Sequence, residues 1–475
     1  MSDAGLSPCL PLASEFPSAS ESDWRKRVEA VLKGTDFEKR LISRTADGIP
    51  IAALYPSGPA LEVRRSAQTP WTVMQRCDHR DPARANAQAL EDLGHGASAL
   101  QFVFAGAPGA HGFGLAPPDG KMIARLMTGI RIDAIDIRLD AGACGIQAAE
   151  MLARWIATQP IDPARLRLCF GLDPIGTGAV QGMINAVYAE ELKKSVATLR
   201  EQDFRGPFVQ ASSTIWHDAG ASEVLELAFM LATGVAYLRV LDQLADDHLK
   251  RAVALTLSAD QDMFITLAKF RAARLLWSRI LTASGLAADA LEIHGETSWR
   301  MMAAQDPHMN ILRATAAVFG AALGGADQIT VLPFSLAQGL PDDFARRIAR
   351  NTQTVLQEES QLWRVSDPAS GSGYVEHLTQ SLCDAAWSLF QDIENRGGIV
   401  SAIESGYVAS RIAEKRNERL ARIKGKAETI IGVTHYPPPR EAAPAIEDIS
   451  RRVAAQTGLA AHRLAETFET AGAQS

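Results

Sequence analysis

The chain has 475 residues, of which 47% are hydrophobic and 22% are charged, and its formal net charge is −7. This length exceeds one average domain and suits a large barrel with extended ends. The acidic balance argues against nucleic-acid binding, because phosphate contacts need clustered Lys and Arg. The longest apolar stretch, Ala314–Ala326, is too short to span a bilayer, so no membrane segment is expected.

Residues 1–20 are rich in Ser and Pro and lack the basic start and apolar core of a secretory signal. The cysteines are widely scattered, and no two have the spacing of metal ligands. They are Cys9, Cys77, Cys144, Cys169 and Cys383. We therefore expect reduced thiols, no metal site and a cytoplasmic protein.

The first part, residues 1–70, is expected to be an extended arm. Asp23 is a candidate cap for a short helix over Trp24–Lys33, with Gly34 just after its end. Four prolines between Asp36 and Pro70 break any longer element. Such a segment cannot form its own core, so we expect it to lie on another surface and wrap a partner.

The second part alternates strand and helix signals from about Pro70 to Phe334. Its candidate strands are Ala99–Phe104, Ala134–Leu139, Leu166–Gly171, Phe208–Ser212, Ala236–Val240, Met263–Ala268, Leu291–Gly295 and Gln328–Pro333. Eight such alternations predict an α/β fold of the (β/α)8 TIM barrel type. A doubly wound open sheet is the rival, but its glycine-rich nucleotide loop is missing, since Gly109–Gly114 lacks the right flanking residues.

The third part is helical. Leu378, Leu382, Ala385, Leu389 and Ile393 share one face of an amphipathic helix that ends near Gly397. A charge-laced helix is expected over Ile412–Lys426, and Pro437–Pro439 closes this part. We place the barrel with its trailing helices at residues 71–440 and a tail, helical or frayed, at residues 441–475.

Several phrases in this order resemble one known family. They are WRKRVEAVLKGTDFEKRLISRTADGIPIAALYP (Trp24–Pro56), TPWTVMQRCDHRDPARANAQALEDLGHGASAL (Thr69–Leu100), AKFRAARLLW (Ala268–Trp277), ARRIARNTQTVLQEES (Ala345–Ser360) and IIGVTHYPP (Ile430–Pro438). Together they resemble the methylmalonyl-CoA mutase family. The segments Ser213–Leu241 and Gly324–Phe334 resemble in particular its small, non-catalytic subunit.

The resemblance implies a function. Members of the family interconvert (R)-methylmalonyl-CoA and succinyl-CoA by a radical rearrangement that depends on adenosylcobalamin. The CoA arm threads the barrel axis and the cobalamin lies on the C-terminal rim of the strands. A C-terminal flavodoxin-like domain holds the cofactor through an Asp-x-His-x-x-Gly loop, whose histidine ligates cobalt. Here Asp246–His248 is followed by Leu249, Lys250 and Arg251, so the motif is absent and no such B12 domain is expected.

The family's substrate positions also differ in this chain. A catalytic tyrosine is replaced by Ser66. A Tyr-His pair becomes Thr214–Ile215, or Trp216–His217 if two residues are deleted. The strand end that carries a family Thr-Ile-Gln-Asn-Asp is Cys169–Pro174, which lacks the amide.

On the seventh strand the family pattern Arg-x-His-x-Gln-Thr-Ser is only partly kept. His294, Thr297 and Ser298 match it and are the expected substrate-binding remnants, while Glu292 and Glu296 replace Arg and Gln. A carboxylate about 4 Å from an anionic thioester would cost about 4 kcal/mol at an effective dielectric of 20. We therefore expect no catalytic residue in this chain, and acyl-CoA binding that is weak if it occurs at all.

Other polar clusters have plainer interpretations. His294 is either a remnant ligand or a strand-end histidine satisfied by carboxylates. Glu292 and Glu296 lack the nucleophile or metal ligand that an acid–base pair needs. His217 beside Asp218 is expected to pack at a strand–loop junction. The helix Arg411–Lys426 interleaves Glu with its basic residues, which is typical of a solvated or interface face.

The sequence Asp78–Asp81, Asp-His-Arg-Asp, is a further charged cluster that has metal potential. A solvated loop with local salt bridges is the favoured interpretation.

Two functions stay open. The chain is either a non-catalytic small subunit that forms a heterodimer with the catalytic large subunit, or a substrate-binding large subunit that uses a separate small B12-binding protein. The degenerate positions Ser66, Glu292 and Glu296 favour the first.

Overall fold

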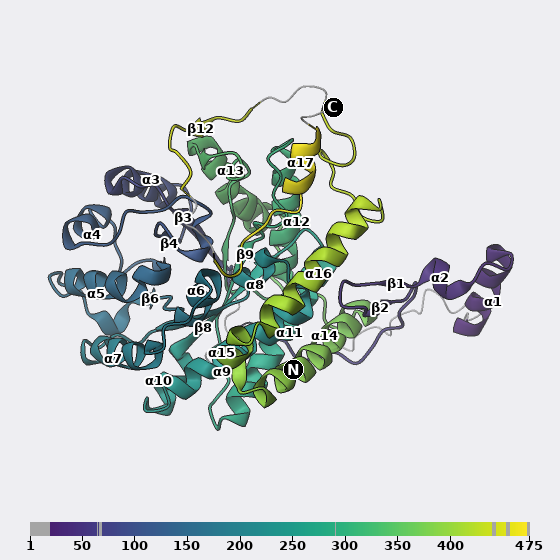
Figure 1. Cartoon of the computed structure of the whole chain (residues 1–475), viewed down its shortest axis with the longest axis horizontal. Coiled ribbons are helices and arrows are strands. Elements are labelled where there is room, and N and C mark those ends of the chain that lie inside the picture. The colour runs from purple at the N-terminus through teal and green to yellow at the C-terminus, as the bar shows by residue number, and fades with distance from the viewer. Residues whose placement is uncertain are drawn as a thin grey trace, which may run out of the picture. The chain divides into compact units, whose positions relative to one another are not determined.

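The computed structural model describes residues 20–63, 65, 69–289, 291–438, 443–452 and 457–472. The chain divides into two compact units, Met1–Tyr55 and Pro56–Ser475. The second unit contains the barrel (Figure 1). The expected boundaries at residues 70 and 440 stay predictions.

The first unit holds two short helices and a two-stranded hairpin. Helix α1 (Glu21–Leu32) begins after Ser20, whose Oγ accepts the Asp23 amide at 3.1 Å. The cap is therefore Ser20, and the expectation of Asp23 as the cap is wrong because Asp23 lies inside the first turn. Helix α2 (Phe37–Leu41) places the Phe37 ring edge-on to Trp24, with 6.1 Å between ring centroids. Strands β1 (Ser43–Arg44) and β2 (Pro50–Ile51) pair antiparallel.

The second unit is built on eight parallel strands that form a barrel. Their hydrogen-bonded order is β6-β5-β4-β3-β10-β9-β8-β7. A bridge between Leu172 and Val209 joins the two ends of this order, so the sheet closes. The strands are β3 (Thr72–Cys77), β4 (Ala99–Val103), β5 (Asp136–Asp140), β6 (Arg167–Cys169), β7 (Val209–Ser212), β8 (Val253–Ala259), β9 (Ile293–Thr297) and β10 (Gln328–Thr330). The predicted (β/α)8 barrel is confirmed.

Six of the eight predicted strands are correct in place, and two are wrong. Ala236–Val240 and Met263–Ala268 belong to helices α9 (Glu223–Val240) and α11 (Met263–Ala283). Both helices are buried on most sides, so their apolar runs lack the polar face that distinguishes a helix from a strand. The true strands β3 and β8 were not predicted.

Helices cover the outside of the barrel (Figure 1). Those that follow the strands are α3 (Pro82–Gly94), α4 (Gly120–Leu126), α5 (Gly145–Ile156), α6 (Pro174–Gln181), α7 (Tyr188–Glu201), α8 (Thr214–Ala219), α10 (Asp246–Ala252), α12 (Met309–Leu323) and α13 (Asp343–Thr354). The later helices are α14 (Gly373–Asn395), α15 (Gly398–Glu404) and α16 (Tyr407–Lys424). The two predicted helices of the third part correspond to α14 and α16, and α14 packs on α9 and α11.

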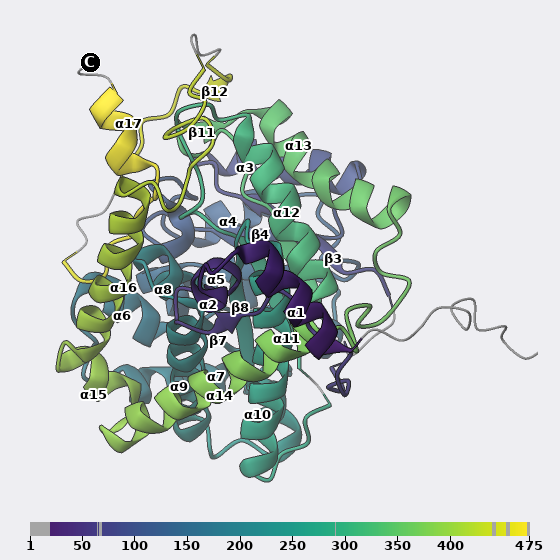
Figure 2. The ribbon, with the colours of Figure 1, turned by 90° about the vertical axis from the view of Figure 1, so that its right-hand side faces the viewer.

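A segment near the C-terminus, described over residues 446–452 and 457–472, runs over the C-terminal rim of the barrel. It starts with β12 (Ile446–Glu447), which pairs with β11 (Leu340–Pro341), and ends in α17 (Glu466–Gly472) (Figure 2). Between them its backbone amides donate to carbonyls of loops and short helices that follow different strands. These bonds are Arg452 to Gly112, Leu459 to Ala179, His462 to Asp218 and Leu464 to Arg300. We call residues 446–452 and 457–472 the rim segment. The tail, expected to be helical or frayed, thus contains the helix α17 and is docked through these described residues.

None of the helices within the described ranges is long and apolar enough to cross a membrane.

Candidate functional site

The barrel interior is lined mainly by polar side chains. Because successive side chains of a strand alternate between its faces, residues two apart point inward together. The inward set includes Arg76, Gln101, Asp136, Arg138, Asp140, Gln210, Ser212, Thr256, Ser258, His294, Glu296 and Thr330. Buried polar groups need hydrogen-bond partners, so these side chains must satisfy one another.

Three hydrogen bonds across the interior satisfy several of these side chains. Arg138 Nη2 donates to Gln210 Oε1 at 3.0 Å and also reaches the Thr256 hydroxyl. Gln101 Nε2 donates to Glu296 Oε2 at 3.1 Å. The interior is therefore bridged from β5 to β7 and β8, and from β4 to β9.

The Arg138–Gln210 contact separates two cavities. Arg138 lines a large cavity of about 840 Å³ at the N-terminal ends of the strands. Gln210 lines a small cavity of about 20 Å³ at the C-terminal rim. The bore of this barrel is thus divided by the contact between these two side chains.

The larger cavity is rich in arginine. Its basic lining residues are Arg138, Arg165, Arg167, Arg200, Arg205 and Arg251. Arg167 forms an ion pair with Asp136 at 2.5 Å. Glu292 also lines this cavity, and burial raises its pKa, with the Asp327 charge adding to the effect.

The smaller cavity carries two buried carboxyl groups. Burial raises the pKa of Asp140 to about 7, and the charge of Glu296 adds to this. Burial raises the pKa of Asp173 to about 6, although the Tyr237 hydroxyl donates to its Oδ1 at 2.5 Å. The C-terminal mouth of this barrel is therefore acidic and nearly filled.

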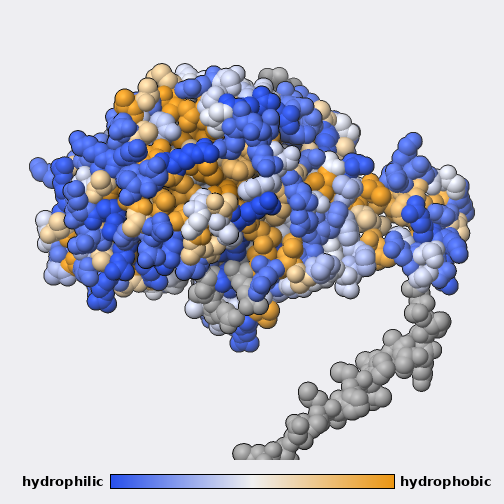
Figure 3. Space-filling model, turned by 90° about the horizontal axis from the view of Figure 1, so that it is seen from below, coloured by the Kyte–Doolittle hydropathy of each residue, from blue (hydrophilic) through white to orange (hydrophobic). Residues whose placement is uncertain are grey.

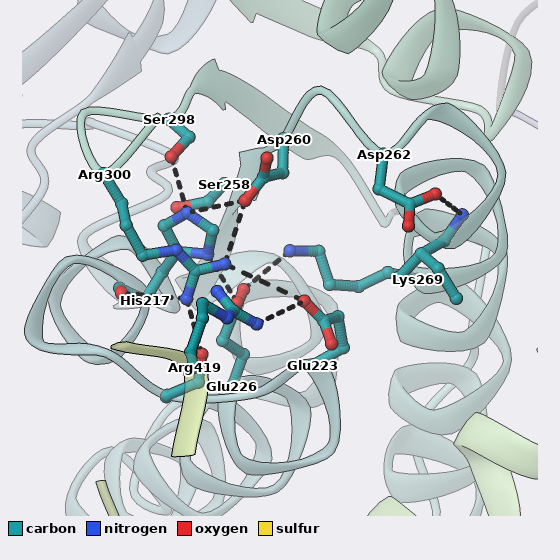
Figure 4. A network of polar contacts seen from close by, with 12 residues as sticks. His217, Glu223, Glu226, Ser258, Asp260, Asp262, Lys269, Ser298, Arg300 and Arg419 are labelled. Carbon is teal, nitrogen blue, oxygen red and sulfur yellow. Dashed lines mark hydrogen bonds and ion pairs between the residues drawn. The ribbon is translucent and has the colours of Figure 1, made fainter. Parts of the chain in front are cut away.

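A fully buried polar network lies beside this mouth (Figure 4). His217 on α8 has its Nδ1 at 2.5 Å from Glu226 Oε1, and its Nε2 at 2.6 Å from Ser298 Oγ. Lys269 Nζ donates to the other Glu226 oxygen at 2.7 Å. Burial lowers the pKa of His217 well below its usual value, and the Arg300 charge adds to this. The ring is neutral, so a proton on Nδ1 lets it donate to Glu226 and accept the Ser298 hydroxyl at Nε2.

The order Ser298, His217, Glu226 has the geometry of a nucleophile, base and orienting acid. Their exposed fractions are 1%, 0% and 0%, so no substrate reaches the serine in this conformation. The serine also accepts the Met301 amide at 3.1 Å. We therefore interpret this triad as a structural network.

Arg300 ties the network to the adjacent loops. Its guanidinium donates to Asp260 Oδ2 at 2.9 Å and to the Ala221 carbonyl at 2.6 Å. Burial raises the pKa of Asp260, but the neighbouring charges and hydrogen bond, Arg300 first among them, together outweigh burial and hold that pKa well below its usual range. The Arg300 carbonyl in turn accepts the Leu464 amide of the rim segment at 3.0 Å.

A second buried ion cluster corrects a sequence interpretation. Asp78 was expected in a solvated loop, yet it is 1% exposed and lies 2.6 Å from both Arg76 and Arg346. Burial opposes its ionisation, but the two guanidinium groups, Arg346 first, lower the pKa of Asp78 to about 2. Asp81 is exposed and caps α3.

The rim segment closes the C-terminal mouth from outside. The Arg451 guanidinium lies 5.0 Å from the Trp299 ring centroid, and its Nε donates to the His111 carbonyl at 2.8 Å. Arg463 lies over the same indole at 5.8 Å. Trp299 follows β9, so aromatic and cationic side chains of distant segments meet directly above the strands.

The predicted substrate remnants all make internal contacts. His294 Nε2 lies 2.9 Å from Thr330 Oγ1, and Thr297 Oγ1 accepts the Leu332 amide at 2.8 Å. Ser298 belongs to the buried network. Glu296 faces the upper interior as expected, whereas Glu292 lies four residues earlier, about 13 Å along the strand, in the N-terminal cavity. The expectation that both carboxylates face one thioester is therefore wrong.

Other predicted positions are placed as follows. Thr214 and Ile215 line the small cavity at the start of α8, and Asp173 of the Cys169–Pro174 strand end caps α6. Ser66 lies outside the described residues.

Sequence reasoning missed Arg138, Lys269 and Glu226. The available signal was a charged residue inside an otherwise apolar stretch, which in a buried element demands a partner.

The cofactor implied by the resemblance does not fit the described residues. His248, the histidine of the Asp-x-His sequence, lies on α10 before β8, at the end of the barrel opposite the rim segment. It contacts Arg200 Nη2 at 2.7 Å. The rim where a corrin ring would lie is occupied by the rim segment, residues 446–452 and 457–472. Within the described residues no group of three or more His, Cys, Asp or Glu is arranged to hold a metal ion.

These features define a (β/α)8 barrel protein whose bore is divided by its own polar side chains. The sequence pattern of the methylmalonyl-CoA mutase family matches residues 26–469, and the chain belongs to that family.

Similar proteins carry a consistent name. The chain is 39% identical over 454 residues to the methylmalonyl-CoA mutase small subunit of Streptomyces virginiae, covering 90% of this chain and 72% of the relative. It is 36% identical over 496 residues to the small subunit from Propionibacterium freudenreichii subsp. shermanii, covering 97% and 75%. A methylmalonyl-CoA mutase of Cereibacter sphaeroides is 30% identical over 468 residues, covering 87% of this chain and 64% of the relative.

The Lys269–Glu226 pair predicts a large loss of stability when it is broken. Lys269→Met leaves Glu226 buried without its cation, which is expected to lower the free energy of unfolding by about 3–5 kcal/mol. Lys415→Met is the matched control, because Lys415 pairs with Glu418 at the surface and its loss is expected to cost less than about 1 kcal/mol. Urea unfolding followed by circular dichroism measures both, and equal effects would contradict the assignment.

Asp140 and Asp173 predict a pH dependence of stability. Their pKa values are raised in the folded state, so the folded chain holds protons that the unfolded chain has lost. Stability is therefore full near pH 4 and falls as the pH rises through about 6 to 7. Asp140→Asn is expected to remove on the order of 2–4 kcal/mol of this fall. Unfolding midpoints between pH 5 and 8 check the slope, and an unchanged slope in the variant argues against the assignment to Asp140.

Proposed function

We propose that the chain is the small, non-catalytic subunit of an adenosylcobalamin-dependent methylmalonyl-CoA mutase, paired with a catalytic large subunit in a heterodimer. The holoenzyme interconverts (R)-methylmalonyl-CoA and succinyl-CoA. Membership of the family and the names of the relatives support this assignment.

The observation that carries the proposal is the divided bore. An acyl-CoA that threads the barrel axis has to pass the level of Arg138, Gln210 and Thr256. Moving Arg138 aside leaves a buried guanidinium without partners, which costs about 1.5–3 kcal/mol for each charged hydrogen bond lost. The barrel therefore favours its own internal contacts over a threaded ligand.

The remnant residues support the same conclusion. His294, Thr297 and Ser298 keep the family's residue types, and in this chain each is engaged by a neighbouring side chain or amide. We assign them a residual, weak role toward acyl-CoA at most, and none in catalysis.

The rim argues against the alternative of a substrate-binding subunit served by a separate B12-binding protein. Such a protein has to approach the C-terminal ends of the strands. That surface is covered by the rim segment through the backbone bonds of Arg452, Leu459, His462 and Leu464.

The N-terminal unit is proposed to bind the large subunit. It forms few elements and leaves large apolar side chains in solvent, with Val31 79% exposed and Leu54 50% exposed. On one face of the molecule, apolar side chains also gather within a hydrophilic surround (Figure 3). Exposed apolar surface of this kind marks protein contacts. We keep residues 1–70 as the arm, 71–440 as the barrel with its helices and 441–475 as the tail.

A cytoplasmic location is part of the proposal. Cys77, Cys144, Cys169 and Cys383 are free thiols, which suits a reducing compartment.

Reconstitution tests the proposal. Mixed with adenosylcobalamin and methylmalonyl-CoA, the purified chain is expected to show no turnover, and with a full-length large subunit it is expected to elute as a 1:1 complex with mutase activity. Glu296→Gln in this chain is expected to change kcat/KM of the complex by less than about twofold. In this proposal Glu296 does not contact the reacting substrate, and a side chain that does not stabilise the transition state leaves kcat/KM unchanged. Succinyl-CoA formed with only a stand-alone B12-binding protein would overturn the small-subunit assignment.

The arm has its own test. Val31→Asp places a charge on the apolar surface of α1 and is expected to weaken the complex with the large subunit at least about tenfold. Val365→Asp, at a valine that is 60% exposed in the second unit, serves as the matched control. Surface plasmon resonance measures both, and equal affinities for wild type and Val31→Asp would exclude a gripping role for α1.

A further inference from the structure

We propose that the small cavity at the C-terminal rim binds one hard divalent cation, Mg²⁺ or Ca²⁺, through the carboxylates of Asp140 and Asp173 and the hydroxyl of Thr177. The inference is independent of the proposed subunit role. It concerns a structural ion inside this chain.

The first observation in support is that the two carboxylates have few partners. Asp140 ends β5, is 9% exposed, and its side chain has no hydrogen bond or ion pair among the described residues. The hydrogen bonds found to the Asp173 side chain both fall on Oδ1, from the Tyr237 hydroxyl at 2.5 Å and the Gly176 amide at 2.9 Å. Oδ2 of Asp173 has no such bond within the described part of the chain. Burying a carboxylate without a partner costs free energy of folding, so a cation bound at this point is expected to stabilise the folded chain.

The neighbouring arginines are engaged elsewhere. Arg138 donates to Gln210 and Thr256, and Arg76 forms its ion pair with Asp78. Neither lines the small cavity, so neither fills the place between the two carboxylates.

Thr177 is the second, independent observation. It lies on α6, lines the same cavity and is 6% exposed. Its Oγ1 is buried without a hydrogen-bond partner in the described structure. A helical threonine normally bonds the carbonyl one turn before it, so an unpaired hydroxyl beside two carboxylates indicates a ligand that accepts its lone pair.

Two glycines leave room for the carboxylates. A Cβ at Gly109 would lie 2.4 Å from Asp140 Oδ2, and a Cβ at Gly176 would lie 2.3 Å from Asp173 Oδ2. Any side chain at either position would collide with a proposed ligand oxygen. The two glycines therefore leave free the space that the carboxylate oxygens occupy at this cavity.

Size and chemistry select the ion. A cavity of about 20 Å³ holds about one water-sized species. The donors are all oxygens, with neither His nor Cys among the lining residues, which suits a hard cation and not zinc or copper. Two carboxylates balance a charge of +2. Ser212, which also lines the cavity, adds a hydroxyl oxygen.

Calorimetry and thermal unfolding of the full chain test this. The chain is stripped with a chelator, dialysed, and titrated at one pH near 8 with MgCl₂ and with CaCl₂, and NaCl at matched ionic strength is the salt control. One divalent ion per chain is expected to bind and to raise Tm by mass action, whereas NaCl is expected to have little effect.

Variants assign the site. Asp140→Asn and Thr177→Val keep the side-chain shapes, and each is expected to weaken the divalent response at least about tenfold. Asp136→Asn is the matched control, because Asp136 is an inward, buried carboxylate at the opposite end of the same strand β5. It is expected to keep the full response.

Three results would contradict the proposed cation site. No binding of either divalent ion to wild type, equal stabilisation by NaCl, or an undiminished response in both Asp140→Asn and Thr177→Val overturns the proposal. Far-UV circular dichroism of each variant confirms that it is folded. If Asp140→Asn does not fold, Thr177→Val alone decides, since it removes a hydroxyl and no charge.

Discussion

The polar side chains that point into this barrel need partners, and most of those partners come from the protein itself. A TIM barrel is normally a packed core of branched apolar residues. This one has guanidinium, carboxylate, amide and imidazole groups in that place, and burying them without partners would cost several kcal/mol each. The Arg138–Gln210–Thr256 and Gln101–Glu296 contacts meet this need. These same contacts divide the bore into a large cavity at the N-terminal ends of the strands and a small one at the C-terminal rim.

Buried polar groups also need partners at the C-terminal rim. Arg300 donates to the carbonyls of His217 and Ala221, at the end of α8 and just after it, and to the Asp260 carboxylate, and its own carbonyl accepts an amide of the rim segment. Groups with the residue types of a catalytic site are thus used for holding segments together. Family membership is compatible with this, because one fold can carry different functions when its site residues change.

Sequence reasoning predicted the barrel correctly, but for partly different strands. The runs Ala236–Val240 and Met263–Ala268 favour strands because α9 and α11 are apolar nearly all round, and Gln75 and Arg76 interrupt the apolar pattern of Thr72–Cys77. His294, Thr297 and Ser298 make internal contacts, and their role toward a substrate stays a prediction. The pairing of Arg138 with Gln210 was beyond reach, since it depends on which side chains of three separate strands meet across the bore.

The path of the rim segment also bears on how the chain folds. Its docking carbonyls at Gly112, Ala179, Asp218 and Arg300 belong to loops and helices that follow four different strands, and they come together only when the sheet has closed. The segment itself is synthesised long after β10. During translation the nascent barrel therefore exists for a period without the rim segment, and its acidic C-terminal mouth is open to solvent or to chaperones until that segment has emerged and docked.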